Sequence, residues 1–112
     1  MNRFRKTIEC LKRYHPEKII LFGSSARGEI DKNSDLDFVV VKKTKKRFIE
    51  RLIEVSRLLG NDISDVDVFV YTPDEFQRMI EWENPFIENV LKEGKILYEK
   101  RERRSRKMVK TI

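Results

Sequence analysis

Apolar side chains recur with the period of a helix in two stretches of the chain. In residues 2–14 the recurring positions are Phe4, Ile8 and Leu11. In residues 45–59 they are Phe48, Leu52, Val55 and Leu59. This spacing places apolar side chains on one face of a helix, so we predict an amphipathic helix in each stretch. Pro16 follows the first helix and Gly60 the second, and both residue types commonly follow a helix end.

Three shorter runs of apolar and mostly β-branched residues predict strands, because such residues fit the surface of a sheet. These runs are Lys18–Phe22, Leu36–Val41 and Asp65–Tyr71. Residues 23–34, between the first two runs, are mostly polar and contain Gly and Ser. We therefore predict a connection without regular structure there.

Two helix-start signals follow the third strand. Thr72 can cap a helix that begins at Pro73, and Glu75 stands where it completes a capping box with Thr72. A second cap-and-proline pair, Asn84-Pro85, predicts another helix.

That last helix should end near Gly94, and residues 95–98 can add a final edge strand. The order of elements predicts an α+β fold, in which a small mixed sheet carries helices packed mainly on one face. A chain of 112 residues fits one compact domain and is too short for a catalytic and a separate substrate domain. We assign residues 1–98 to this domain and residues 99–112 to a basic C-terminal tail.

The positive charge of the chain is concentrated in this tail. The formal net charge is +6, and residues 99–112 supply +5 of it, from seven Lys and Arg against two Glu. A short basic terminus is usually a solvated tail. We therefore do not expect nucleic-acid binding, although the tail could grip a protein partner.

The sequence excludes a helical membrane protein. No apolar run approaches the roughly 18 residues that a membrane-spanning helix needs, and no secretory signal opens the chain. Cys10 is the only cysteine, so no internal disulfide can form, which fits a reducing compartment. These features lead us to expect a cytoplasmic protein.

Two aspartates, Asp35 and Asp37, stand at the start of the second predicted strand. Side chains on a strand alternate between faces, so both carboxylates should project from one side while Leu36 and Phe38 turn to the core. Two adjacent like charges destabilise a fold unless a cation lies between them, and carboxylate oxygens suit Mg²⁺ or Mn²⁺ held together with substrate phosphates. An Asp-x-Asp pair alone is more often a turn or cap element, so its neighbours decide its meaning.

Gly23 and Ser24 directly follow the first strand. A glycine there lets backbone amides approach a ligand, and a serine hydroxyl can donate to a phosphate oxygen. Arg27 adds a cation nearby, although alone it could be a surface residue or an ion-pair partner of Glu29. Together with the aspartates, this turn supplies the positioning and charge neutralisation that phosphoryl transfer requires.

A third acid would complete a site for two metal ions. The third predicted strand offers Asp67, which stands between two valines, where an unpaired carboxylate would be costly. Asp65, nearer to the preceding turn, is the alternative, and both could also be strand-end caps. We favour Asp67.

The motif formed by Gly23-Ser24, ten further residues and Asp35-Leu36-Asp37 resembles the signature of the DNA polymerase β nucleotidyltransferase superfamily. With Ala26-Arg27-Gly28 included, the chain resembles the minimal nucleotidyltransferases (MNT proteins) over nearly all of residues 1–98. The resemblance implies the nucleotidyltransferase fold, two Mg²⁺ ions as cofactors and ATP as substrate.

The resemblance also assigns roles to individual residues. It implies metal-binding and catalytic roles for the three acids Asp35, Asp37 and Asp67. It implies contacts with the triphosphate for the turn residues Gly23 and Ser24, with Arg27 beside them. Asp67 is then the best candidate for the general base that activates an acceptor hydroxyl.

Small MNT proteins resemble antitoxins whose partner is a HEPN-domain RNase toxin, and members of this group transfer AMP to a tyrosine hydroxyl of the toxin. The resemblance thus implies a protein adenylyltransferase that forms a hetero-oligomer with its target. Two other hypotheses stay open, namely an antitoxin that acts by binding alone and a nucleic-acid binder that acts through the tail. Trp82 could serve a partner interface, although a tryptophan in such a position is more often an ordinary core or surface residue.

Overall fold

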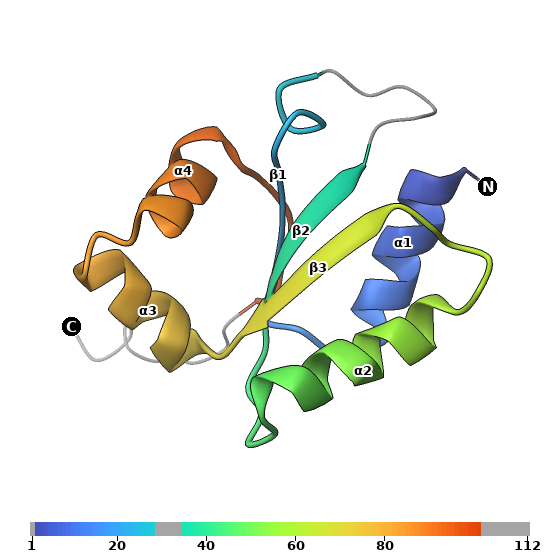
Figure 1. The fold of residues 1–112 in the computed structure, drawn as a ribbon, viewed down its shortest axis with the longest axis horizontal. Coiled ribbons are helices and arrows are strands. Elements are labelled where there is room, and N and C mark those ends of the chain that lie inside the picture. Colours follow the sequence, from blue (N-terminus) through green and yellow to red (C-terminus); the bar gives the residue numbers. More distant parts are fainter. Residues whose placement is uncertain (1, 29–34, 102–112) are drawn as a thin grey trace.

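The computed structural model describes residues 2–28 and 35–101 and contains four helices and four strands in this part of the chain (Figure 1). In chain order they are α1 (Arg3–Lys12), β1 (Lys18–Phe22), β2 (Leu36–Val41), α2 (Phe48–Leu59), β3 (Val66–Tyr71), α3 (Pro73–Glu81), α4 (Pro85–Glu93) and β4 (Lys95–Glu99). The sequence predicted each of these elements, including the final strand. None of the four helices is long and apolar enough to cross a membrane.

Local hydrogen bonds explain where the helices begin. Thr72 Oγ1 accepts a hydrogen bond from the Glu75 amide at 3.1 Å, and Glu75 Oε1 accepts one from the Thr72 amide at 2.8 Å, which confirms the predicted capping box. Helix α2 begins three residues later than predicted. Thr44 Oγ1 accepts a hydrogen bond from the Lys46 amide at 3.1 Å, and this local turn keeps residues 45–47 out of the helix.

The sheet is mixed and has the strand order β3-β2-β1-β4. Strand β1 pairs antiparallel with both β2 and β4, whereas β2 pairs parallel with β3. Strands β3 and β4 are therefore the two edges. This order confirms the predicted α+β class and places β3, the strand that carries Asp67, where one side is unpaired.

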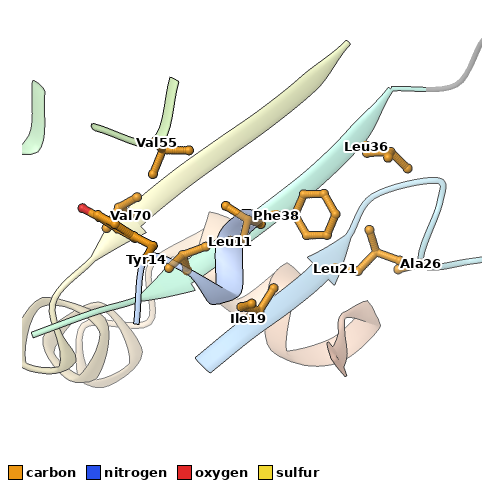
Figure 2. Packing of buried hydrophobic residues seen from close by; sticks show 10 residues of the cluster. Leu11, Tyr14, Ile19, Leu21, Ala26, Leu36, Phe38, Val55 and Val70 are labelled. Carbon is orange, nitrogen blue, oxygen red and sulfur yellow. The ribbon is translucent and has the colours of Figure 1, made fainter. Parts of the chain in front are cut away.

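The helices divide over both faces of the sheet, which corrects the expectation that they pack mainly on one (Figure 1). On one face α1 and α2 cover Phe38 and its neighbours, and Figure 2 shows Leu11 of α1 and Val55 of α2 among these side chains. On the other face α3 and α4 cover Val39 and Val41. Successive residues of β2 point to opposite faces and are all apolar after Asp37, so both faces need cover.

A partly buried ion pair joins the two helix layers around the end of β3. Arg51 of α2 is 5% exposed, and its Nη1 and Nη2 atoms donate to the two carboxylate oxygens of Glu75 of α3, at 2.7 and 3.1 Å. Arg51 Nη1 also donates to the Val70 carbonyl oxygen at 3.1 Å. A bidentate pair of this kind fixes geometry as well as charge, so it holds the outer edge of β3 against α2.

Candidate active site

Asp37 and Asp67 lie side by side on neighbouring strands. They are direct partners in the parallel register of β2 and β3, so their side chains project from the same face of the sheet, the one that carries α3 and α4. Leu36 and Phe38 are 1% and 0% exposed, which confirms that they turn to the core. Asp37 is half-buried and Asp67 is exposed. The expectation that Asp67 would be buried between its neighbouring valines was therefore wrong, because β3 is an edge strand.

The environment of Asp37 disfavours its charged form. Partial burial raises the pKa of the Asp37 carboxyl, and the charges of Asp67 and Asp35 and a hydrogen bond with Asp67 raise this pKa further. Two carboxylates in this relation repel each other, and a cation between them would remove the repulsion. The structure thus shows at Asp37 and Asp67 the juxtaposition that was inferred from the sequence for a pair of metal ligands.

Asp35 stands just before β2 and its side chain is exposed. Its backbone is held in place, since Ser25 Oγ donates a hydrogen bond to the Asp35 carbonyl oxygen at 3.1 Å. Among residues 2–28 and 35–101, no three or more His, Cys, Asp or Glu side chains form a ready-made metal site. The described arrangement therefore brings Asp37 and Asp67 together, with Asp35 close enough for its charge to act on Asp37 but outside a three-acid group.

The turn after β1 approaches the acids directly. Gly23 has a φ of +78°, and a Cβ atom at this position would lie 2.6 Å from Asp37 Oδ2. Only glycine leaves room for the carboxylate and adopts this backbone conformation without strain. The Gly23 and Ser24 carbonyl oxygens accept hydrogen bonds from the Ala26 and Arg27 amides, both at 3.1 Å, and so close the turn. Ser24 thus stands one residue from the point of closest approach to Asp37.

Arg27 is anchored to α4 in this arrangement. Its Nη1 atom lies 3.1 Å from Glu93 Oε1, in an ion pair that is partly open to solvent. The alternative partner, Glu29, lies outside the described residues. The ion pair places Arg27 between the turn and α4, so α4 forms one flank of the site.

Three aromatic residues that were not singled out from the sequence lie on the face of the sheet that carries the two acids. Phe22 is the strand partner of Asp37, and Phe69 follows Asp67 by two residues, so both side chains lie on the face of the acids. Phe86 of α4 packs edge-on against both rings, with centroid distances of 5.3 and 5.4 Å. The three rings thus form an aromatic cluster on the face of the sheet that carries Asp37 and Asp67. The signal in the sequence was the alternation of Asp67 and Phe69, which places them on one face.

Ser25 is a further residue that the sequence analysis passed over. It is 2% exposed, and its hydrogen bond to Asp35 ties the turn after β1 to the start of β2. The sequence offered only its place beside Ser24. Its role depends on a contact between segments ten residues apart, which the local pattern does not contain.

Comparisons with known proteins agree with this geometry. Residues 5–103 match the family model described as polymerase beta, nucleotidyltransferase. A Methanocaldococcus jannaschii protein named as a protein adenylyltransferase is 32% identical over 98 residues, which cover 88% of this chain and 94% of the relative.

Two solved structures with a similar fold come from toxin–antitoxin complexes. A chain of such a complex, solved with AMP-PNP, has a TM-score of 0.60 at 27% identity, with coverage of 99% of this chain and 84% of that chain. The complex of a tri-AMPylated Shewanella oneidensis HEPN toxin with an MNT antitoxin gives a TM-score of 0.51 at 20% identity, with coverage of 98% and 83%, and shows the fold alone. The family model spans most of the chain, and the Methanocaldococcus relative aligns along nearly all of it, so the chain belongs to the polymerase beta nucleotidyltransferase family.

Proposed function

We propose that the chain transfers AMP from ATP to a hydroxyl group, most specifically a tyrosine hydroxyl, of a HEPN-domain toxin, and acts as the antitoxin of that toxin. The observation that carries the proposal is the pairing of Asp37 with Asp67 on adjacent strands, beside a glycine turn that leaves no room for a Cβ atom next to the Asp37 carboxylate. The relative named as a protein adenylyltransferase supports AMP as the transferred group. The similar chain from a toxin–antitoxin complex solved with AMP-PNP supports the partner and the nucleotide.

In this proposal Asp35, Asp37 and Asp67 hold two Mg²⁺ ions. The donor set fits the ion, because Mg²⁺ is commonly held by one or two carboxylates together with substrate phosphates, and Asp37 and Asp67 already supply two adjacent carboxylates. When bound, the ions would neutralise the charge of the triphosphate and of the departing pyrophosphate.

The turn residues Gly23 and Ser24 hold the triphosphate, and Arg27 adds a positive charge at its flank. Gly23 lets the backbone come close to both the Asp37 carboxylate and the phosphates, because no side chain intervenes. Asp37, on an inner strand between β1 and β3, is held in a fixed place for this task.

The reaction is a substitution at the α-phosphorus of ATP. The acceptor hydroxyl oxygen forms a bond to the α-phosphorus, the bond from that phosphorus to the bridging oxygen breaks, and pyrophosphate leaves with the electron pair. The hydroxyl proton passes to the Asp67 carboxylate, which acts as the general base. The exposure of Asp67 at the sheet edge lets a hydroxyl on a large acceptor reach it.

The test is label transfer to a purified HEPN-domain partner in the presence of Mg²⁺. ATP labelled on the α-phosphate should label the partner, whereas ATP labelled on the γ-phosphate should not, which separates nucleotidyl from phosphoryl transfer. Asp37→Asn should abolish the label, and Asp74→Asn, at an exposed acid in the first turn of α3, should leave it unchanged. Absence of label with the wild-type chain, or full label with Asp37→Asn, would contradict the proposal.

A growth assay separates catalysis from binding alone. If the antitoxin acts by transfer, Asp37→Asn should no longer protect cells that express the HEPN toxin. Protection by Asp37→Asn at wild-type strength would instead support the hypothesis that the chain neutralises its partner by contact.

A further inference from the structure

We propose that the unpaired edge of β3 is the docking site for the acceptor protein, whose reactive segment adds to the sheet as an extended strand beside Asp67. This inference rests on the proposed transfer to a protein hydroxyl and specifies how the acceptor is held. The acceptor edge, as we call it, consists of the outward-facing backbone of residues 66–70 and the cavity between β3 and α2.

The hydrogen bonds show which backbone groups of β3 face outward. Asp65 and Tyr71 offer their carbonyl oxygens to amides at the two ends of β2, at 3.0 and 2.9 Å. Backbone groups alternate in direction along a strand, so residues 67 and 69 also face β2, whereas Val66, Val68 and Val70 face away from it.

At the C-terminal end of β3 the outward-facing carbonyl oxygen already has a hydrogen-bond partner. The Val70 carbonyl oxygen accepts a hydrogen bond from Arg51 Nη1 at 3.1 Å. Within the part of the chain that the structure describes, Val66 and Val68 have no backbone partner on the outer side. The unbonded backbone N–H and C=O groups of these two residues thus lie on either side of Asp67 along the strand. An added strand could form hydrogen bonds with all of them.

A cavity of about 240 Å³ lies alongside this edge, between β3 and α2. Its lining includes Leu52, Ser56 and Leu59 of α2, the loop residue Ile63 and Asp67 itself. Side chains of an added strand alternate between faces, so a residue on one side would enter this cavity. The next residue would then point to the face of Asp37 and Asp67, where a hydroxyl group must be presented.

Charge favours a basic acceptor segment over a second copy of this chain. Asp62, Asp65 and Asp67 are all exposed around the open part of the edge. Two cations reach its ends: Arg3 donates to the Ser64 carbonyl oxygen, and Arg51, which is paired with Glu75, donates to that of Val70. Two copies paired edge to edge around Val66–Val68 would place Asp67 opposite itself, and like charges directly opposite are destabilising. A segment that carries Lys or Arg beside its hydroxyl residue would be attracted instead.

The test removes one outward amide without breaking the sheet. Val68→Pro lacks the outward N–H, keeps the bonds between β2 and β3, and restricts Asp67 to the extended conformation that it already has. AMP transfer to the HEPN-domain partner should fall at least tenfold, while binding of Mg²⁺ and ATP stays at the wild-type level. Val68→Ala keeps the N–H and should lose less than threefold.

A second pair of variants tests the cavity in case the proline variant does not fold. Ser56→Trp fills the cavity and should reduce transfer at least tenfold, whereas Ile49→Trp, on an exposed part of the same helix outside the cavity, should not change it. Transfer at the wild-type rate by a folded Val68→Pro or Ser56→Trp variant would overturn the proposal.

Amide hydrogen exchange gives a readout that does not depend on catalysis. The Val66 and Val68 amides should exchange rapidly in the free chain and slowly in the complex with the partner, while the Asp67 amide, which faces β2, stays protected in both. If the wild-type chain transfers no AMP, the proposed function fails, but protection of these two amides in the complex would still support docking at the edge. A complex in which the Val66 and Val68 amides are not protected would overturn the docking proposal. Protection of these amides in the free chain would assign the edge to a second copy of this chain and would also overturn the proposal.

Discussion

Replacing Asp37 by Asn should make the metal-free chain more stable while it abolishes activity. Asp37 is half-buried beside Asp67, and burial and the charge of Asp67 raise its pKa, so its charged form is destabilising at neutral pH. Asn has nearly the same size and shape but carries no charge. The substitution therefore removes the repulsion and keeps the packing against Gly23.

The size of the effect follows from the spacing of the strands. Direct partners on neighbouring strands lie roughly 5 Å apart, and two unit charges at that distance repel by about 3 kcal/mol at an effective dielectric constant of about 20 and by about 0.8 kcal/mol in water. Because Asp67 is exposed, the lower part of this range applies, and we expect a gain of about 1 kcal/mol. For a domain of this size that gain raises the melting temperature by about 4–8 °C.

Urea unfolding in EDTA, followed by circular dichroism, measures this gain. Asp62→Asn, which removes an exposed loop carboxylate, should stay within about 0.5 kcal/mol of the wild type. Addition of Mg²⁺ with ATP should reverse the order, because ligands stabilise the state that binds them and Asp37→Asn lacks one metal ligand. Equal or lower stability of Asp37→Asn in EDTA would refute the electrostatic account of the site.

Three further substitutions test other parts of the structure. Gly23→Ala should displace the Asp37 carboxylate and destabilise the chain by about 1–2 kcal/mol, because the φ of +78° is strained for alanine; AMP transfer should fall at least tenfold in the same preparation. Arg27→Ala should weaken ATP binding at least tenfold in a titration, yet lower the free energy of unfolding by less than about 1 kcal/mol, because its pair with Glu93 is partly exposed. Glu75→Gln keeps a capping side chain but leaves Arg51 unpaired, and should cost about 1–3 kcal/mol, less than a fully buried pair because Glu75 is 38% exposed. The hydrogen bond from Arg51 lowers the pKa of Glu75. The wild type therefore has the stability of this pair above the ordinary glutamate pKa of about 4.3 and loses it as the pH falls through the lowered pKa. Unfolding measured from pH 7 to 3 should show this loss in the wild type and not in Glu75→Gln.

Features of the fold that arise from neighbouring residues could be predicted from the sequence, and features that arise from strand order could not. The capping box of Thr72 and Glu75 is a contact over three residues, and it fixed the start of α3 correctly. The division of the helices over both faces depends on how four distant segments assemble. Leu36–Val41 did contain a hint, because a continuous apolar strand is typical of a sheet that is covered on both sides.

The same distinction applies to the candidate site. Alternation along the strands was enough to place Asp37 and Asp67 on one face, whereas Asp35 stands before the first residue of β2, where strand alternation does not fix its side chain. The exposure of Asp67 was missed, because valines on both sides along the chain do not reveal whether a strand is central or at an edge. The ion pair of Arg51 with Glu75 was also missed, since its partners are 24 residues apart and meet only when α2 and α3 pack around β3.

The edge position of β3 gives the two paired acids different access to a large substrate. Asp37 lies between β1 and β3, with the Gly23 turn against its carboxylate, so a protein cannot approach it from either side within the sheet. Asp67 has the same register but only one neighbouring strand, and the approach from outside β3 is open as far as the Arg51 contact at Val70. An acid held on both sides suits the fixed ligands of a nucleotide site, whereas an acid at an open edge suits the removal of a proton from a protein hydroxyl. This asymmetry predicts that Asp37→Asn impairs both the binding of Mg²⁺ with ATP and AMP transfer, whereas blocking the edge at Val68 impairs transfer alone.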